Sequence, residues 1–207
     1  ALRVYGSPMS YNSQVGVALS LLELEHAASV AVIECGISRP GEMDRLQRMV
    51  RPDLGVFVNV GDAHLEGLGS RSVTAREKAR LFAWLPADGV VFVPHAETLA
   101  ADATAGVGAA VQKVGTPADA AALDEPFATD AALALAVASS LGVARHVALT
   151  GLTAWRPAPM RMEITETPRG VTVINDAYVA DPVSTELALS VLARRRGAGR
   201  AVAVLGG

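Results

Sequence analysis

One histidine, two carboxylates and three glycines follow each other within eleven residues of this chain. They form Asn59-Val-Gly-Asp-Ala-His-Leu-Glu-Gly-Leu-Gly69, whose start overlaps an apolar run at 54–60 that predicts a buried strand. Ligands of open α/β sheets bind beyond the carboxyl ends of strands, so His64 lies where a site is expected. A second apolar run, 30–33, ends in Glu34. Together Glu34 and His64 outline a site for a hard divalent cation at one rim of a sheet.

Each of these residues also has an ordinary structural interpretation. Glu34 is equally suited to cap a helix, and His64 to be a hydrogen-bonded loop histidine. Lys78 lies in Arg76-Glu-Lys-Ala-Arg-Leu-Phe82, where a helical lysine among charged neighbours indicates a solvated face. The polar segment Tyr11-Asn-Ser-Gln14 precedes a helical pattern and could either cap that helix or present amides to a phosphate. Spacing alone does not choose between these interpretations.

Strands that alternate with helices must position these side chains. The β-branched runs predict parallel strands, and the intervening patterns have helical period. A turn at Thr167-Pro-Arg169 predicts a small β-hairpin. We therefore expect an α/β fold, with a mainly parallel sheet covered by helices on both faces. The expected strands are 30–33, 54–60, 89–93, 111–114, 160–165, 170–174 and 201–205; the expected helices are 15–24, 42–50, 72–85 (capped by Ser72), 127–141, 143–149 as a turn or short helix, and 183–196.

Composition narrows the class of protein. The 207 residues are 51% hydrophobic and carry a formal charge of −3, which gives no reason to expect a nucleic-acid partner. The single cysteine, Cys35, excludes an internal disulfide, and we interpret it as a small buried residue and not as a nucleophile. No apolar run reaches the roughly 18–20 residues of a membrane span. A cytoplasmic location is the expectation.

Four sequence blocks resemble the Mur ligases in order and spacing. They are Ser10 to Leu22, Ala31 to Glu42, Asn59 to Gly69 and Val173 to Pro182. The wording Tyr-Asn-x-Gln and Gly-x-Ser-x-Pro-Gly-Glu is most similar to the members that add D-alanyl-D-alanine, including a form fused to an alanine racemase. The blocks are specific as a set, and the resemblance covers nearly the whole chain.

The resemblance implies a role for each candidate residue. Glu34 and His64 would hold magnesium, and Lys78, if carbamylated by carbon dioxide, would help hold a second ion; these three would carry the catalytic role. A neutral lysine is needed first, so burial or the neighbouring Arg76 and Arg80 must lower its pKa. The nucleotide would be contacted by Arg161, Asn175, Asp176 and Tyr178, and the UDP-linked substrate by Asn12, Ser13, Gln14 and Asn59.

The implied reaction is ATP- and Mg²⁺-dependent amide ligation through an acyl phosphate. Its substrates would be a UDP-N-acetylmuramoyl-peptide and D-alanyl-D-alanine. Two alternatives stay open: another ligase of the superfamily, such as a different Mur ligase or a folylpolyglutamate or cyanophycin synthetase, and a non-catalytic fragment that binds only a partner domain. Two positions depart from the commoner wording of the fourth block, Val179 and Asp181, so we assign no role to them.

The largest departure from the family is the absence of G-x-x-x-x-G-K-[ST], whose backbone N–H groups and lysine cradle phosphates. In the family this loop lies just upstream of Ser10, so it would precede Ala1. We therefore expect residues 1–198 to be a Mur ligase central domain without its phosphate loop, and 199–207 to begin a C-terminal Rossmann-like domain. N- and C-terminal domains of a longer chain would be its partners, and the 207 residues alone would not ligate with ATP.

Overall fold

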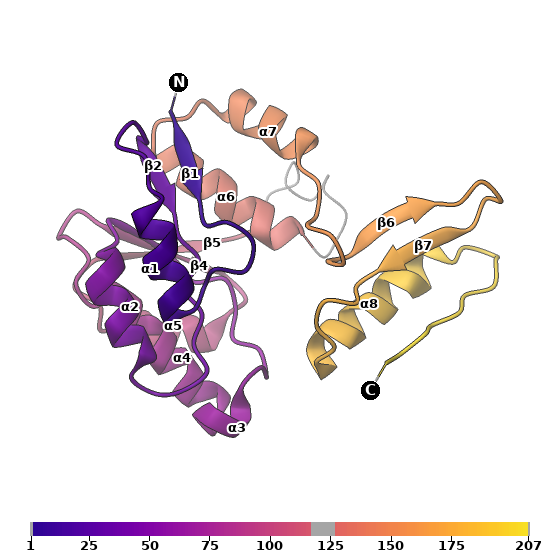
Figure 1. Cartoon of the computed structure of the whole chain (residues 1–207), viewed down its shortest axis with the longest axis horizontal. Helices are drawn as coiled ribbons and strands as arrows, with labels where there is room; N and C mark the ends of the chain where they lie inside the picture. The colour runs from indigo at the N-terminus through magenta and orange to yellow at the C-terminus, as the bar shows by residue number, and fades with distance from the viewer. Residues whose placement is uncertain (1, 117–126, 207) are drawn as a thin grey trace. The chain divides into compact units, whose positions relative to one another are not determined.

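The computed structural model describes residues 2–116 and 127–206. The chain divides into two compact units, one formed by Ala1–Val60 with His64–Val114 and the other by Gly61–Ala63 with Gly115–Gly207. Each is described by itself, and Figure 1 shows their elements in chain order from α1 to α8. The segment 115–125 is rich in Ala, Asp and Pro, a composition that predicts a surface excursion, and it falls almost entirely outside the described residues. The predicted domain boundary near residue 199 stays a prediction.

The strands of the first unit are parallel, as predicted, but they form two sheets. The smaller sheet pairs β1 with β2 at Val4↔Val30, and the larger has the order β3-β4-β5, with Gly55↔Val91 in register. Within the described part of the chain, no ladder joins the two sheets. The strands are β1 (Val4–Gly6), β2 (Val30–Val32), β3 (Leu54–Val56), β4 (Val90–Pro94) and β5 (Ala110–Val114).

The helices of the first unit begin and end at the expected kinds of residue. Helix α2 carries Glu42 and Asp44 in its first turn and Arg48 in its last, which suits the helix dipole, and it ends before Pro52. The helices are α1 (Gln14–Leu22), α2 (Glu42–Val50), α3 (Leu65–Leu68), α4 (Arg71–Ala79), the 3₁₀ turn η1 (Arg80–Phe82) and α5 (Thr98–Thr104). The sequence predicted α1, α2 and α4 and missed β1, α3 and α5, all of which are seven residues or shorter.

Two hydrophobic clusters hold the first unit together. In one, Val91 and Val93 of β4 pack against Ala75 and Ala79 of α4, together with Phe82. Side chains alternate along a strand, so Phe92 points to the opposite face of β4, where it is also buried. Both faces of this central strand are therefore covered, as expected of a parallel sheet. The second cluster joins α1, α2 and α3 through Val17, Met43, Leu46, Leu68 and the loop residue Ile37.

Burial differs from the sequence prediction at the smaller sheet. Val32 of β2 is 58% exposed, so the predicted buried strand at 30–33 forms but is not buried. No residue of β2 belongs to either hydrophobic cluster of the described chain, which agrees with this exposure. The strand predicted at 54–60 ends at Val56.

In its described residues, the second unit contains three helices and the predicted hairpin. Strands β6 and β7 are antiparallel with Glu163↔Asn175 in register, and Gly170 takes a left-handed turn conformation at φ 71°. The strand predicted at 201–205 is wrong, because residues 201–206 adopt no regular structure and pair with no strand of the described chain. The elements are α6 (Ala128–Ser140), α7 (Arg145–Ala154), β6 (Glu163–Glu166), β7 (Thr172–Asn175) and α8 (Pro182–Arg195). Across the described ranges, every helix is too short or too polar to span a bilayer.

The N-cap residue of α4 can be tested by substitution. The hydroxyl oxygen of Ser70 accepts a hydrogen bond from Val73 N at 3.3 Å, so Ser70 is the cap, and the prediction of Ser72 is wrong. We expect Ser70→Ala to lower the free energy of unfolding by about 1 kcal/mol, and Ser72→Ala to change it by less than about half as much. Urea unfolding followed by Trp84 fluorescence in a Trp155→Phe background measures both. Equal losses in the two variants would contradict the assignment.

Candidate functional site

Glu34 lies just beyond the carboxyl end of β2, and Asn12 holds its side chain. Asn12 Nδ2 donates to Glu34 Oε1 at 2.7 Å, and the carbonyl oxygen of Asn12 accepts from Gly36 N at 2.8 Å. Glu34 N also donates to the hydroxyl oxygen of Ser7, which follows β1. The exposed Glu34 carboxylate is thus fixed at one oxygen by an amide. The sequence predicted both residues but not their contact.

His64 begins α3 in a left-handed conformation. Its φ is 62°, an uncommon value for a residue with a side chain, although histidine is among the residue types enriched there. Its carbonyl oxygen accepts from Gly67 N and Leu68 N at 3.0 Å each, while its imidazole is exposed and makes no capping bond to the helix. The backbone strain is held by these two bonds. An outlier of this kind supports a functional hypothesis for the imidazole.

Lys78 is partly buried and not on a solvated face. Its Nζ donates to the carbonyl oxygen of Asn59, just beyond β3, at 3.1 Å. Burial lowers the pKa of Lys78 because the ammonium form loses hydration, and the charge of Glu97 opposes this shift. The expected direction of the pKa shift is confirmed. The proposed contribution of Arg80 is not supported, because Arg80 pairs with Asp44 and Glu77.

These side chains suit a magnesium ion only in part. No group of three or more His, Cys, Asp or Glu side chains within residues 2–116 and 127–206 is spaced to hold a metal. Magnesium usually keeps several waters and takes one or two carboxylates plus substrate phosphates, so the donors present fit a partial site completed by substrate. Glu34 and His64 follow strands of different sheets, which departs from the expected single rim. Their sharing of one ion stays a prediction.

Two residues predicted to bind substrate have structural partners. The hydroxyl oxygen of Ser13 accepts from Gly16 N at 3.2 Å and caps α1. Gln14 Oε1 accepts from Arg45 Nη1 at 3.1 Å, which ties α1 to α2. Substrate binding by Ser13, Gln14 and Asn59 stays a prediction.

The four residues predicted to contact a nucleotide gather at the open end of the β6–β7 hairpin. The guanidinium carbon of Arg161 lies 4.1 Å from the centre of the Tyr178 ring, and Tyr178 N donates to the Met160 carbonyl. Asp176 Oδ1 accepts from Met162 N at 2.9 Å, while Asn175 Nδ2 donates to Glu163 at 3.4 Å. Arg161 lies between two left-handed residues, Met160 at φ 60° and Met162 at φ 51°. The arrangement can present a cation and an aromatic face together.

The structure also shows the surroundings of three other polar residues, Cys35, Asp181 and Glu77. Burial, reinforced by the charge of Glu34, raises the pKa of the Cys35 thiol to about 12, so Cys35 is not a nucleophile near neutral pH. Asp181, to which the sequence assigned no role, caps α8 by accepting from Val183 N and Ser184 N. Glu77 was missed altogether: it is only 6% exposed. No sequence signal marks its burial, because Glu77 stands among the charged residues Arg76, Lys78 and Arg80.

Known proteins resemble this chain both in sequence and in fold. A family model described as the Mur ligase middle domain matches residues 2–136. The UDP-N-acetylmuramoyl-tripeptide–D-alanyl-D-alanine ligase of Bacillus subtilis is 30% identical over 99% of this chain and 50% of its own length. MurF from Acinetobacter baumannii superposes with a TM-score of 0.81 at 23% identity, over 93% of this chain and 49% of that chain. MurF from Thermotoga maritima, in complex with ADP, gives 0.79 at 20% identity, over 93% and 51%.

The chain thus spans about half the length of these proteins. The two structural matches, below 25% identity, show the shared fold alone. The family model supports more than a shared fold, because it matches well over half of the chain, including the segment that contains Glu34, His64 and Lys78. This chain belongs to the Mur ligase middle domain family.

Proposed function

We propose that this chain is the central, nucleotide-binding portion of an ATP-dependent ligase that adds D-alanyl-D-alanine to a UDP-N-acetylmuramoyl-tripeptide. The observation that carries the proposal is the alignment of 99% of the chain with the Bacillus subtilis ligase of that name. N- and C-terminal domains would complete the enzyme, the latter beginning near residue 199. A cytoplasmic location follows from the same proposal.

Amide ligation needs an activated carboxylate. A carboxylate oxygen of the peptide attacks the γ-phosphorus of ATP, ADP leaves, and an acyl phosphate forms. The amine of D-alanyl-D-alanine then attacks the acyl carbon, loses a proton, and expels phosphate. Little covalent chemistry falls to the protein, so positioning and charge neutralisation supply most of the rate.

The chain's own residues supply these two functions. Glu34, oriented by Asn12, and His64 would hold magnesium, which when bound neutralises charge on the phosphates. Arg161 and Tyr178 would bind the nucleotide from the hairpin, with Asn175 and Asp176 setting the geometry at its end. Asn12, Ser13, Gln14 and Asn59 would line the side that faces the UDP-linked substrate.

Lys78 would contribute as a carbamate. Carbon dioxide adds only to a neutral amine, and burial makes the neutral form of Lys78 easier to reach than that of an exposed lysine. The ammonium first loses one proton; addition of carbon dioxide to the amine then forms an N–C bond, releases a second proton, and leaves a short anionic oxygen donor. Beside Asn59, this donor would lie at the end of β3.

Substitution at the two proposed metal ligands tests the function. In the full-length protein that carries this chain, we expect Glu34→Ala and His64→Ala each to lower kcat for ligation by about 100-fold, the equivalent of about 3 kcal/mol of transition-state stabilisation. Glu66→Ala is the matched control, because Glu66 is an exposed carboxylate two residues from His64. The assignment would be refuted if all three variants lost activity equally. It would also be refuted if none of the three lost activity.

Carbamylation of Lys78 has a direct spectroscopic test. In ¹³C-bicarbonate, the 207-residue chain should show a carbamate carbon resonance that is absent from Lys78→Met. Ligation by the full-length Lys78→Ala enzyme should fall sharply, bicarbonate should not restore it, and small carboxylic acids should restore part of it. A wild-type spectrum without the resonance, or full activity of Lys78→Ala with no added acid, would leave Lys78 as an ordinary lysine.

The lowered pKa of Lys78 also predicts how stability depends on pH. An unfolded lysine titrates near 10.5, so between the lowered folded pKa and 10.5 the unfolded state binds more protons. The free energy of unfolding should therefore rise with pH across this window in bicarbonate-free buffer, by at most about 1.4 kcal/mol per pH unit. Lys78→Met should lack this increment. Urea unfolding of both proteins, followed through Trp84, measures it, and parallel pH profiles would contradict the pKa shift.

A further inference from the structure

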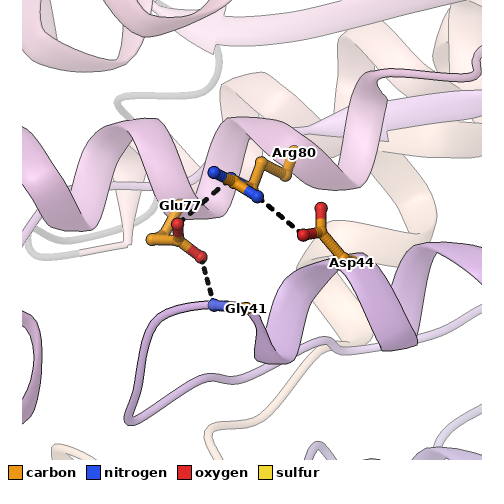
Figure 2. Close-up of polar contacts among 4 residues, drawn as sticks. All are labelled: Gly41, Asp44, Glu77 and Arg80. Atoms are coloured by element: carbon orange, nitrogen blue, oxygen red, sulfur yellow. Dashed lines mark hydrogen bonds and ion pairs between the residues drawn. The ribbon is translucent and has the colours of Figure 1, made fainter.

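A buried carboxylate network joins α4 to the loop that follows Glu34. Glu77 Oε2 accepts from Gly41 N at 2.8 Å, and Glu77 Oε1 lies 3.0 Å from Arg80 Nε. Arg80 Nη1 in turn lies 2.6 Å from Asp44 Oδ2 of α2. Figure 2 shows Glu77 and Arg80 reaching from α4 and η1 to the start of α2. Both oxygens of the buried carboxylate therefore have donors, as a buried charge requires.

The loop held by Glu77 connects Glu34 to α2, and hydrogen bonds fix its backbone at several points along its length. Gly36 N donates to the carbonyl oxygen of Asn12, the same residue whose amide holds Glu34. Glu42 Oε2 accepts from Ser38 N at 2.7 Å and from Arg39 N at 3.0 Å. Gly41, at φ 82°, is the last residue of the loop to be held in this way, and its N–H donates to Glu77. Removing the Glu77 carboxylate would leave this end of the loop without its anchor.

Helix α3, which His64 begins, rests on the same loop. A Cβ added to Gly67 would lie 2.2 Å from the carbonyl oxygen of Ser38, closer than any side chain tolerates. The absence of a side chain at Gly67 thus lets α3 approach the loop backbone directly. A displaced loop would therefore move the support of α3 as well as the segment after Glu34.

Adjacent residues of α4 hold two segments that follow different sheets. Successive residues are about 100° apart around a helix, so Glu77 and Lys78 face different neighbours. Glu77 binds Gly41, at the end of the loop that leads from β2 to α2, while Lys78 Nζ donates to the carbonyl oxygen of Asn59, after β3. Where the structure describes the chain, the two sheets share no strand pairing, so α4 links these two segments through polar contacts.

We propose that Glu77 is a positioning residue that sets Glu34 relative to Lys78 and Asn59, and thereby the geometry of the metal site. This inference rests on the proposed function of Glu34 and Lys78. Glu77 itself touches neither substrate nor metal in this scheme. It acts through Gly41 and the loop, which predicts a change in metal affinity with the fold preserved.

The first experiment measures the loop itself. In the 207-residue chain, Glu77→Ala should raise amide hydrogen exchange in residues 35–41, with Gly41 affected most. Asp44→Ala, which removes a half-exposed partner of Arg80, should give a smaller rise in the same segment. Leu133→Ala is the matched control, because it opens a core cavity in α6 of the second unit, which makes none of the contacts of Glu77. Exchange at 35–41 that rises no more in Glu77→Ala than in Leu133→Ala would overturn the proposal.

The second experiment measures metal affinity in the full-length enzyme. We expect the Mg²⁺ concentration for half-maximal rate, and the Kd for Mn²⁺ read by electron paramagnetic resonance, to rise about tenfold in Glu77→Ala. Glu77→Gln keeps an oxygen acceptor for Gly41 N and should recover part of the affinity. Leu133→Ala should leave both values unchanged. If Glu77→Ala fails to fold, the same two measurements on Glu77→Gln and Asp44→Ala test the positioning role.

Glu34→Ala separates the two ideas. If it binds Mn²⁺ like the wild type, the proposed metal site is wrong, and the positioning role falls with it. If Glu34→Ala loses Mn²⁺ while the Glu77 and Asp44 variants bind it normally, the metal site stands and the positioning role is refuted.

Discussion

The contacts made by α4 are the constraint on which the site depends. Its apolar residues Ala75 and Ala79 pack on β4 of the larger sheet, while Glu77 holds the loop that leaves the smaller one. In the described chain no ladder hydrogen bond crosses between the sheets, so α4 provides a link between them, through its packing on β4 and its contact with the loop that follows β2. The relative placement of Glu34 and Lys78 is therefore a consequence of helix packing and of a few polar contacts.

Burial gives Lys78 properties that its sequence neighbourhood hides. A lysine between Glu77 and Arg80 suggests a hydrated surface, yet burial lowers the pKa of Lys78. The same burial holds Nζ at the carbonyl oxygen of Asn59, 3.1 Å away. Desolvation and a fixed hydrogen bond thus act on one amine, and both follow from packing α4 against the neighbouring helix α5 and the segment after β3.

The sequence predicted the elements whose signal is long or strongly patterned. Apolar runs gave β2, β4 and β5, and a helical pattern gave α8, whose capping box at Asp181 was not predicted. Four-residue α3 and three-residue β1 carry too little periodicity to be found. Division into two sheets was not predictable either, because strand pairing is a long-range property. The burial of Glu77 depends on Gly41, 36 positions away, and no local pattern encodes that contact.

Candidate residues were predictable by type, and their interactions were not. In both units a carboxylate accepts the N–H of a left-handed residue: Glu77 from Gly41 at φ 82°, and Asp176 from Met162 at φ 51°. These two N–H groups donate to side chains and not to backbone carbonyls, so each depends on its carboxylate for a partner. Each of these bonds fixes the chain next to a candidate side chain, Arg161 in the hairpin and the Glu34 loop in the first unit. Replacing a paired buried charge with apolar groups is often neutral or stabilising, so stability alone does not explain why Glu77 is charged. Fixing the backbone beside the site does explain it, since an apolar side chain cannot accept the Gly41 N–H.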